Sequence, residues 1–281
     1  MSTTPLAPSR KTIRDITALK KAGTPVVCLT AYTFPAAKAM DEEVDLILVG
    51  DSVGMVVYGM DSTIPVTMDI MIAHGKAVAN ATKKALVVVD MPFGSYQESP
   101  QQAYRNAVRL LQETGCQAVK LEGGQEMEDT IAFLTMRGVA VMGHIGLQPQ
   151  SVNAVGGYQV FGRQETEEHK IKNDAAAVAR AGAFSIVIEC TAESLAKAIT
   201  EKSAIPTIGI GASAACDGQI LVTEDMVGLT GKKPPKFVHQ YANMSNEFLE
   251  AVQSYATDVR ARTFPRPENT FKDCPKKNGP A

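Results

Sequence analysis

Six short apolar runs recur along the 281-residue chain, and each ends in a polar residue or a glycine. The clearest is Leu46-Ile47-Leu48-Val49, which stops at Gly50 and is followed by Asp51. Uninterrupted apolar runs of this length predict β-strands that are buried on both faces, as in parallel sheets. The residues that end the six runs are Asp51, Asp90, Glu122, His144, Glu189 and Gly211. These ends recur about every 32 residues, close to the repeat of about 31 residues in a (β/α)8 barrel.

The segments between these runs carry the apolar periodicity of helices. No G-x-G-x-x-G motif follows the first predicted strand, which disfavours a dinucleotide-binding fold. We therefore predict an α/β protein, a single-domain (β/α)8 TIM barrel with a C-terminal helical extension. The predicted parts are a flexible N-terminus at residues 1–10, the barrel with its extension at residues 11–264, and a disordered tail at residues 265–281.

Individual elements can also be placed. The predicted helices include residues 34–43, 126–136, 193–202 and the amphipathic extension at 245–262, and residues 220–222 are a weak eighth strand.

Composition limits the possible partners and the compartment. The 28 basic and 30 acidic residues nearly balance, so neither a nucleic acid nor an anionic membrane is implied as a partner. The five cysteines are widely spaced and form no C-x-x-C pair, which argues against a disulfide framework or a thiolate metal site. There is neither a signal-peptide core nor an apolar run of about 18 residues. We expect a cytoplasmic protein that acts on small molecules.

Three carboxylates end neighbouring predicted strands: Asp51, Asp90 and Glu122. Because the carboxyl ends of parallel barrel strands meet at one mouth, we expect these side chains to converge there. Oxygen ligands without cysteine or clustered histidine favour a hard cation, and Mg²⁺ is the usual one. Two other interpretations stay open. An Asp of this kind can simply cap a turn, and Lys120 could neutralise one carboxylate in a structural ion pair rather than bind a substrate carboxylate.

The other polar residues of the mouth suggest an acid–base role. Glu189 lies two strands along from Glu122 and is suited to act as a general base. His144 could ligate a metal, donate a hydrogen bond or fill the mouth, and Ser52 completes the predicted lining. Cys190 could be a nucleophile or a small buried residue. A metal, a base and a lysine together suit a 2-keto acid that loses the proton next to its carbonyl.

The glycines at residues 209–212 have two interpretations. They could let a ligand such as a phosphate approach the backbone, or they could allow tight packing between a strand and its neighbours.

The polar strand ends lie within longer motifs that run in order over almost the whole chain. They are VGDSVGM (49–55), GMDSTIPVT (59–67), DMPF (90–93), VKLEGG (119–124), GHIGLQPQS (143–151), GGY (156–158), IEC (188–190), IGIGA (208–212) and DGQ (217–219). In these motifs the chain closely resembles the ketopantoate hydroxymethyltransferase family, also called 3-methyl-2-oxobutanoate hydroxymethyltransferase. It departs from many members after IGIGA, where residues 213–216 read SAAC.

The resemblance implies a TIM-barrel enzyme of pantothenate synthesis that uses Mg²⁺ and 5,10-methylenetetrahydrofolate to convert 3-methyl-2-oxobutanoate into 2-dehydropantoate. It implies direct metal ligation by Asp51 and Asp90, with Glu122 as a third metal-site carboxylate that can act through water. Glu189 would be the proton acceptor. The predicted substrate-binding residues are Asp51, Ser52, Asp90, Lys120 and His144. The family forms large homo-oligomers, often decamers, so we expect a homo-oligomer in which the C-terminal helix contributes to packing.

Two alternatives compete with this prediction. A lyase or mutase of the phosphoenolpyruvate mutase and isocitrate lyase type would also use Mg²⁺ and a 2-keto acid on a barrel. Such enzymes typically carry a Lys-x-Cys-Gly-His loop, which this chain lacks. A non-catalytic barrel that serves as an assembly scaffold would need no cluster of carboxylates.

Overall fold

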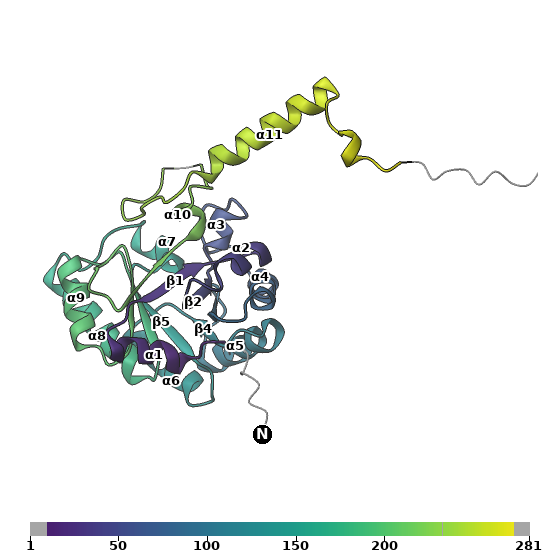
Figure 1. The fold of residues 1–281 in the computed structure, drawn as a ribbon. Coiled ribbons are helices and arrows are strands. Elements are labelled where there is room, and N and C mark those ends of the chain that lie inside the picture. Colours follow the sequence, from purple (N-terminus) through teal and green to yellow (C-terminus); the bar gives the residue numbers. More distant parts are fainter. Residues whose placement is uncertain (1–9, 232, 273–281) are drawn as a thin grey trace, which may run out of the picture.

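A closed barrel of parallel strands forms the centre of the computed structural model, which describes residues 10–231 and 233–272 (Figure 1). Each strand pairs with the next one in the sequence, and β8 pairs with β1 to close the ring. The strands are β1 (Val26–Thr30), β2 (Leu46–Val49), β3 (Leu86–Asp90), β4 (Ala118–Lys120), β5 (Val141–Gly146), β6 (Ser185–Glu189), β7 (Thr207–Ile210) and β8 (Gly218–Leu221). The predicted fold class is confirmed.

Helices surround the barrel, and most of them connect consecutive strands (Figure 1). The longer ones are α1 (Ile13–Ala22), α2 (Phe34–Met40), α4 (Met68–Ala81), α5 (Pro100–Thr114), α6 (Glu128–Thr135), α8 (Glu165–Arg180) and α9 (Glu193–Lys202). Short helical turns lie in the loops: α3 (Val53–Val56), η1 (Gln125–Met127), η2 (Pro149–Ser151), α7 (Val152–Val155) and α10 (Thr223–Met226). The helix predicted at 193–202 coincides with α9.

The strands are buried on both faces, which explains their uninterrupted apolar sequences. In β2, Leu46 and Leu48 belong to the cluster inside the barrel, whereas Ile47 and Val49 pack in the second cluster, between the barrel and its helices. Successive side chains of a strand point to opposite faces, so both faces need apolar residues here. The two clusters together form the hydrophobic core that holds the strand ends in place.

Helix α1 covers the amino-terminal end of the barrel. Its residue Ile16 is fully buried and belongs to the cluster inside the barrel. Lys20 Nζ lies 2.7 Å from Asp217 Oδ2, just before β8, and Lys11 Nζ lies 2.7 Å from Asp45 Oδ1, just before β2. Because α1 covers this end, the interior of the barrel is open towards the carboxyl ends of the strands.

Several boundaries differ from the predictions. The helix predicted at 34–43 ends at Met40, because the next residue, Asp41, accepts hydrogen bonds from the backbone before β3. The helix predicted at 126–136 is divided into η1 and α6. The eighth strand begins earlier than predicted, at Gly218. Residues 211–217, all of them described, join β7 to β8 without a helix.

The C-terminal helix α11 (Met244–Ala261) projects away from the barrel (Figure 1). It matches the helix predicted at 245–262, but none of its described residues is buried in this single chain. The turn η3 (Pro267–Asn269) follows it. The predicted flexible segment lies outside the described residues except for Arg10, whose guanidinium bonds the Ala79 carbonyl at 2.9 Å. Of the predicted tail, residues 265–272 are described and residues 273–281 are not.

None of the helices among the described residues combines the length and the apolar character that crossing a membrane requires.

Asp41 provides a test of the packing between α2 and β3. Its buried carboxylate accepts hydrogen bonds from the backbone N–H groups of Lys83, Lys84 and Ala85. Because Asp41→Ala would leave these donors without partners, we expect it to lower the free energy of unfolding by about 3 kcal/mol. Urea denaturation measures this change. Asp69→Ala, which removes an exposed ion pair with Arg109, should cost less than about 1 kcal/mol; equal effects of the two variants would contradict the role of Asp41.

Candidate active site

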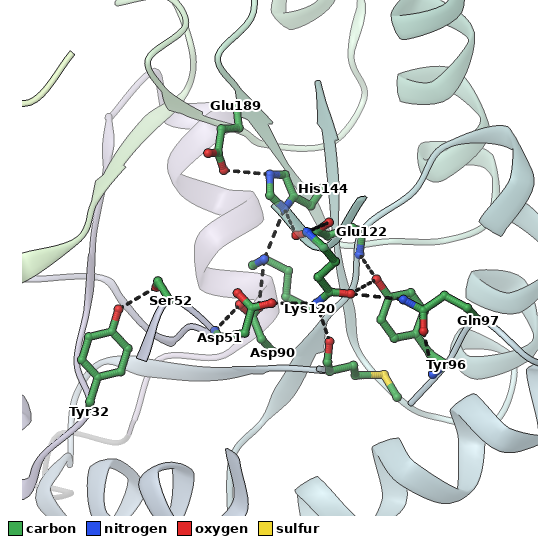
Figure 2. A network of polar contacts seen from close by, with 12 residues as sticks. Tyr32, Asp51, Ser52, Asp90, Tyr96, Gln97, Lys120, Glu122, His144 and Glu189 are labelled. Atoms are coloured by element: carbon green, nitrogen blue, oxygen red, sulfur yellow. Dashed lines mark hydrogen bonds and ion pairs between the residues drawn. The ribbon is translucent and has the colours of Figure 1, made fainter. Parts of the chain in front are cut away.

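A cavity of about 1110 Å³, including its open mouth, lies at the carboxyl ends of the strands. The structure places every site residue predicted from the sequence on its lining: Asp51, Ser52, Asp90, Lys120, Glu122, His144 and Glu189. Figure 2 shows most of these side chains joined in one polar network.

Asp51 and Asp90 are neighbours at the ends of β2 and β3. The backbone N–H of Asp51 donates to Asp90 Oδ2 at 3.0 Å, and Lys120 Nζ lies 2.9 Å from Asp90 Oδ1. All three side chains are buried. The ion pair between Lys120 and Asp90 is the structural role that the sequence left open for Lys120. Lys120 also lies on the cavity wall, so its ammonium group is available to a substrate.

The charges in this cluster shift one another's pKa values. Burial and the charge of Asp90 raise the pKa of Asp51 to about 7. Burial and the charge of Asp51 raise the pKa of Glu122 well above its usual range. Burial opposes the charge of Lys120, but Asp90, Asp51 and Glu122 outweigh it and raise the pKa of Lys120. These shifts show that the single lysine does not offset the cost of ionising the buried acids together, and a bound cation would favour their ionised forms.

Glu122 lies two residues beyond the end of β4, where the sequence had predicted that the strand would continue. Its backbone N–H donates to the hydroxyl of Tyr96 at 3.1 Å instead of to a neighbouring strand. Its carboxylate still faces the cavity, with Oε1 at 3.6 Å from His144 Nδ1.

His144 connects Glu189 to the rest of the network (Figure 2). Burial and the nearby Lys120 lower the pKa of His144, so its ring is neutral at pH 7. Lys120 Nζ, which can only donate, lies 3.3 Å from His144 Nδ1. The ring proton is therefore on Nε2, which lies 3.0 Å from Glu189 Oε2 without the alignment of a regular hydrogen bond. Of the three roles considered for His144, that of a donor to Glu189 fits better than that of a metal ligand, because Nε2 lies close to Glu189 and Nδ1 already faces Lys120.

Glu189 is the most accessible acid of the network. Its side chain is 16 % exposed, compared with 3 % for Asp90 and Glu122. The next residue, Cys190, adopts a left-handed backbone conformation, with φ of 43°. Burial and the charge of Glu189 raise the pKa of Cys190 to about 12, so its thiol is protonated at neutral pH and is a poor nucleophile.

Sequence reasoning missed an uncharged group of residues behind the acids. Gln150 donates from Nε2 to Asp51 Oδ2 at 2.8 Å and from its backbone N–H to Glu122 Oε2 at 3.1 Å. Tyr96 and Gln97 contact the same amide, and Tyr32 bonds Ser52 Oγ at 2.7 Å (Figure 2). Gln150 lies within the motif GHIGLQPQS, but an amide carries no charge that would mark it as part of a site.

Two carboxylates fit a divalent cation better than three. In the part of the chain that the structure describes, there is no group of three or more His, Cys, Asp or Glu side chains arranged to hold a metal. Asp51 and Asp90 form a buried and mutually repelling pair, and Mg²⁺ is often held by one or two carboxylates, with water and substrate as its other ligands. Glu122, which is bonded to Gln150, fits a contact through water. The predicted metal site, with Asp51 and Asp90 as direct ligands and Glu122 as a third carboxylate, remains a prediction.

The glycines at residues 209–212 serve packing. A Cβ atom on Gly211 would lie 2.8 Å from the ring of Phe237, which folds back over the end of β7. A Cβ atom on Gly209 would lie 3.0 Å from Gln219 Oε1. These positions are filled by protein atoms, so the alternative of a phosphate against this backbone is not favoured.

Comparison with known proteins identifies the family. A family model described as ketopantoate hydroxymethyltransferase matches residues 10–267. The chain belongs to this family. A 3-methyl-2-oxobutanoate hydroxymethyltransferase from Rhizobium etli is 60 % identical over 255 residues, which cover 91 % of this chain and 93 % of the relative. The enzyme of the same name from Rhodospirillum rubrum is 57 % identical over 272 residues, covering 96 % and 98 %. The predicted family is confirmed, as is the prediction of an enzyme.

Two solved structures with a similar fold share much less of their sequence with this chain than the hydroxymethyltransferases do. A phosphonopyruvate hydrolase in complex with oxalate and Mg²⁺ has a TM-score of 0.59 at 13 % identity, with 93 % of this chain and 91 % of that chain covered. A 2,3-dimethylmalate lyase of the PEP mutase/isocitrate lyase superfamily has a TM-score of 0.53 at 16 % identity, with 89 % and 98 % covered. At these identities the likeness concerns the fold alone.

The raised pKa of Asp51 predicts a pH-dependent gain in stability for Asp51→Asn when divalent cations are removed by a chelator. Between the ordinary carboxyl pKa and about 7, the folded protein keeps Asp51 protonated while the unfolded chain ionises it. The stability of the wild type therefore falls as the pH rises through this window. We expect Asp51→Asn to have a higher Tm than the wild type at pH 8, with a gap that narrows towards pH 5.

Differential scanning calorimetry across this pH range measures the gap. The control Asp61→Asn changes an exposed carboxylate and should alter stability by no more than about 0.5 kcal/mol. A wild type that is more stable than Asp51→Asn at pH 8 would show that Asp51 is not destabilised by its neighbours.

Proposed function

We propose that this chain transfers a hydroxymethyl group from 5,10-methylenetetrahydrofolate to 3-methyl-2-oxobutanoate, giving 2-dehydropantoate, with Mg²⁺ in the site. Family membership supports the reaction. The observation that carries the proposal is the cavity itself, which is lined by an acid pair and by an accessible carboxylate beside a neutral histidine.

Asp51 and Asp90 would hold the cation, with Glu122 reaching it through water. When bound, Mg²⁺ would draw negative charge onto the carbonyl oxygen of the keto acid and so make the neighbouring C–H bond more acidic. Lys120 is protonated and lies on the cavity wall, where it would bind the carboxylate of the keto acid. Ser52, fixed by Tyr32, would add a hydrogen bond to the same substrate.

Glu189 would remove the proton from C3 of the keto acid. One of its oxygens, Oε2, lies 3.0 Å from His144 Nε2, which leaves the other free to face the substrate. The electron pair released at C3 would then form the bond to the one-carbon unit, both bonds from that carbon to the two folate nitrogens would break, and water would supply the hydroxyl oxygen. The proton from C3 and one proton of the water would end on those two nitrogens. His144 orients the base in this scheme and stays neutral.

The experiment that tests this function compares the wild type with Glu189→Gln in two assays that contain Mg²⁺. The first follows formation of 2-dehydropantoate from both substrates. The second follows exchange of the C3 proton of 3-methyl-2-oxobutanoate in D₂O by NMR, without folate. Because glutamine cannot take up the proton, we expect both rates to fall by about 10²-fold or more, while Mg²⁺ binding by calorimetry is retained.

The two assays separate the possible failures. Glu165→Gln, an exposed acid on α8, is the control and should match the wild type. Exchange that persists in Glu189→Gln would remove Glu189 from the role of base. A wild type that exchanges the proton but forms no 2-dehydropantoate would contradict the transfer reaction and would favour another enzyme of 2-keto acids, such as a lyase.

We also propose that the protein is a homo-oligomer in which α11 packs against a second copy. The helix carries an apolar stripe at helical spacing, and in the single chain the stripe is exposed: Phe248, Leu249, Val252, Tyr255 and Val259. Phe248 is 68 % exposed and Tyr255 is 58 % exposed. An apolar surface of this kind on a projecting helix is typical of an interface between subunits.

Charges placed in this stripe should disrupt assembly. We expect the double variant Phe248→Glu and Val252→Glu to elute with a smaller mass than the wild type in size-exclusion chromatography with light scattering, because two charges would be buried in the interface. Glu250→Gln, on the same helix but outside the stripe, should keep the wild-type mass. A monomeric wild type would contradict the proposed assembly.

A further inference from the structure

Gln150 is a buried residue with no role in the proposed reaction, and its side-chain amide and backbone N–H are all hydrogen-bonded. It lies in η2, in the loop after β5, and is 3 % exposed. Its Nε2 donates to Asp51 Oδ2 at 2.8 Å and to the Met91 carbonyl at 2.9 Å. Its backbone N–H donates to Glu122 Oε2 at 3.1 Å. One residue thus contacts carboxylates that follow β2 and β4, on either side of the strand that carries Asp90.

Two donors, from Tyr96 and Gln97, fix the orientation of the Gln150 amide. Tyr96, which is buried, donates its hydroxyl proton to Gln150 Oε1 at 2.6 Å, and Gln97 Nε2 lies 3.2 Å from the same oxygen. The Tyr96 hydroxyl itself accepts from the Glu122 backbone N–H, so its own proton must point to Gln150. A flipped amide would face two donors with its nitrogen and two acceptors with its oxygen. The donor side of Gln150 is therefore held towards Asp51.

This arrangement acts on the geometry of the acid pair. With Oδ2 engaged by Gln150, the carboxylate of Asp51 cannot rotate freely, and its other oxygen is left for a ligand in the cavity. The hydrogen bond also favours the ionised form of Asp51, against burial and the charge of Asp90. Glu122 is held in the same way by the backbone of the same residue.

We propose that Gln150, oriented by Tyr96, is the positioning residue that holds Asp51 and Glu122 ready for a divalent cation. The inference rests on the proposed function, because it assigns the cation to this acid cluster. Gln150 does not touch the substrate in this scheme. It acts through the two carboxylates, and it ties the long loop after β5 to the site that this loop covers.

The experiment measures Mg²⁺ binding by isothermal titration calorimetry, with the full-length protein and no substrate. Gln150→Met keeps the length of the side chain but removes both the donor and the acceptor. Loss of a residue that orients metal ligands typically weakens metal affinity by about 10–100-fold, and we expect a loss in this range. Tyr96→Phe leaves the amide in place but frees its orientation, and it also removes the acceptor of the Glu122 backbone N–H. It should weaken binding in the same direction by a smaller factor. Gln101→Met, at an exposed position of α5, is the control and should bind as the wild type does.

The readout distinguishes positioning from a purely structural role. A structural role would lower the Tm of Gln150→Met and leave the Kd for Mg²⁺ of the folded protein unchanged, and this result would overturn the inference. If Gln150→Met does not fold, Tyr96→Phe decides: an unchanged Kd overturns the inference and a weakened one supports it. A wild type that binds no Mg²⁺ would overturn the metal assignment and the inference with it, whereas wild-type binding that both variants retain would overturn the inference alone.

Discussion

Repulsion between buried carboxylates is the constraint around which the mouth of this barrel is organised. Asp51 and Asp90 are held together by a backbone hydrogen bond at the ends of adjacent strands, where neither can move away from the other. Lys120 compensates part of their charge at 2.9 Å from Asp90. The surrounding donors, from Gln150 and from backbone N–H groups, stabilise the ionised forms. Buried acids that repel one another lower the stability of the folded protein, and such clusters are typical of sites that bind ligands or carry out chemistry.

The fold and the charged part of the site could be predicted from the sequence, because each depends on a local pattern. Strands buried on both faces need uninterrupted apolar runs, and the residue that ends each run lies at the mouth once the runs form one barrel. This is why Asp51, Asp90 and Glu189 could be assigned to the mouth of the barrel from the sequence alone.

The uncharged part of the site and some element boundaries depend instead on contacts between distant parts of the chain. Gln150 reaches Asp51 across 99 positions and Tyr96 across 54. No local pattern distinguishes a glutamine that makes such contacts from one on the surface. The boundary at Met40 has a similar origin, since the chain leaves the helix where Asp41 finds backbone donors more than 40 residues later. The direct connection from β7 to β8 could not be foreseen either, because it depends on close packing around Gly209 and Gly218.

The position of α1 has a consequence for the order of events during turnover. Ile16 fills the interior at the amino-terminal end, so ligands reach the acid cluster from the carboxyl ends of the strands, where Tyr158 and Phe237 line the cavity. In the proposed reaction, the small keto acid would bind at the floor of the cavity and would enter before the bulkier folate. The product would then leave after the folate. The filled amino-terminal end of the barrel would thus set the order in which ligands bind and leave at the carboxyl end.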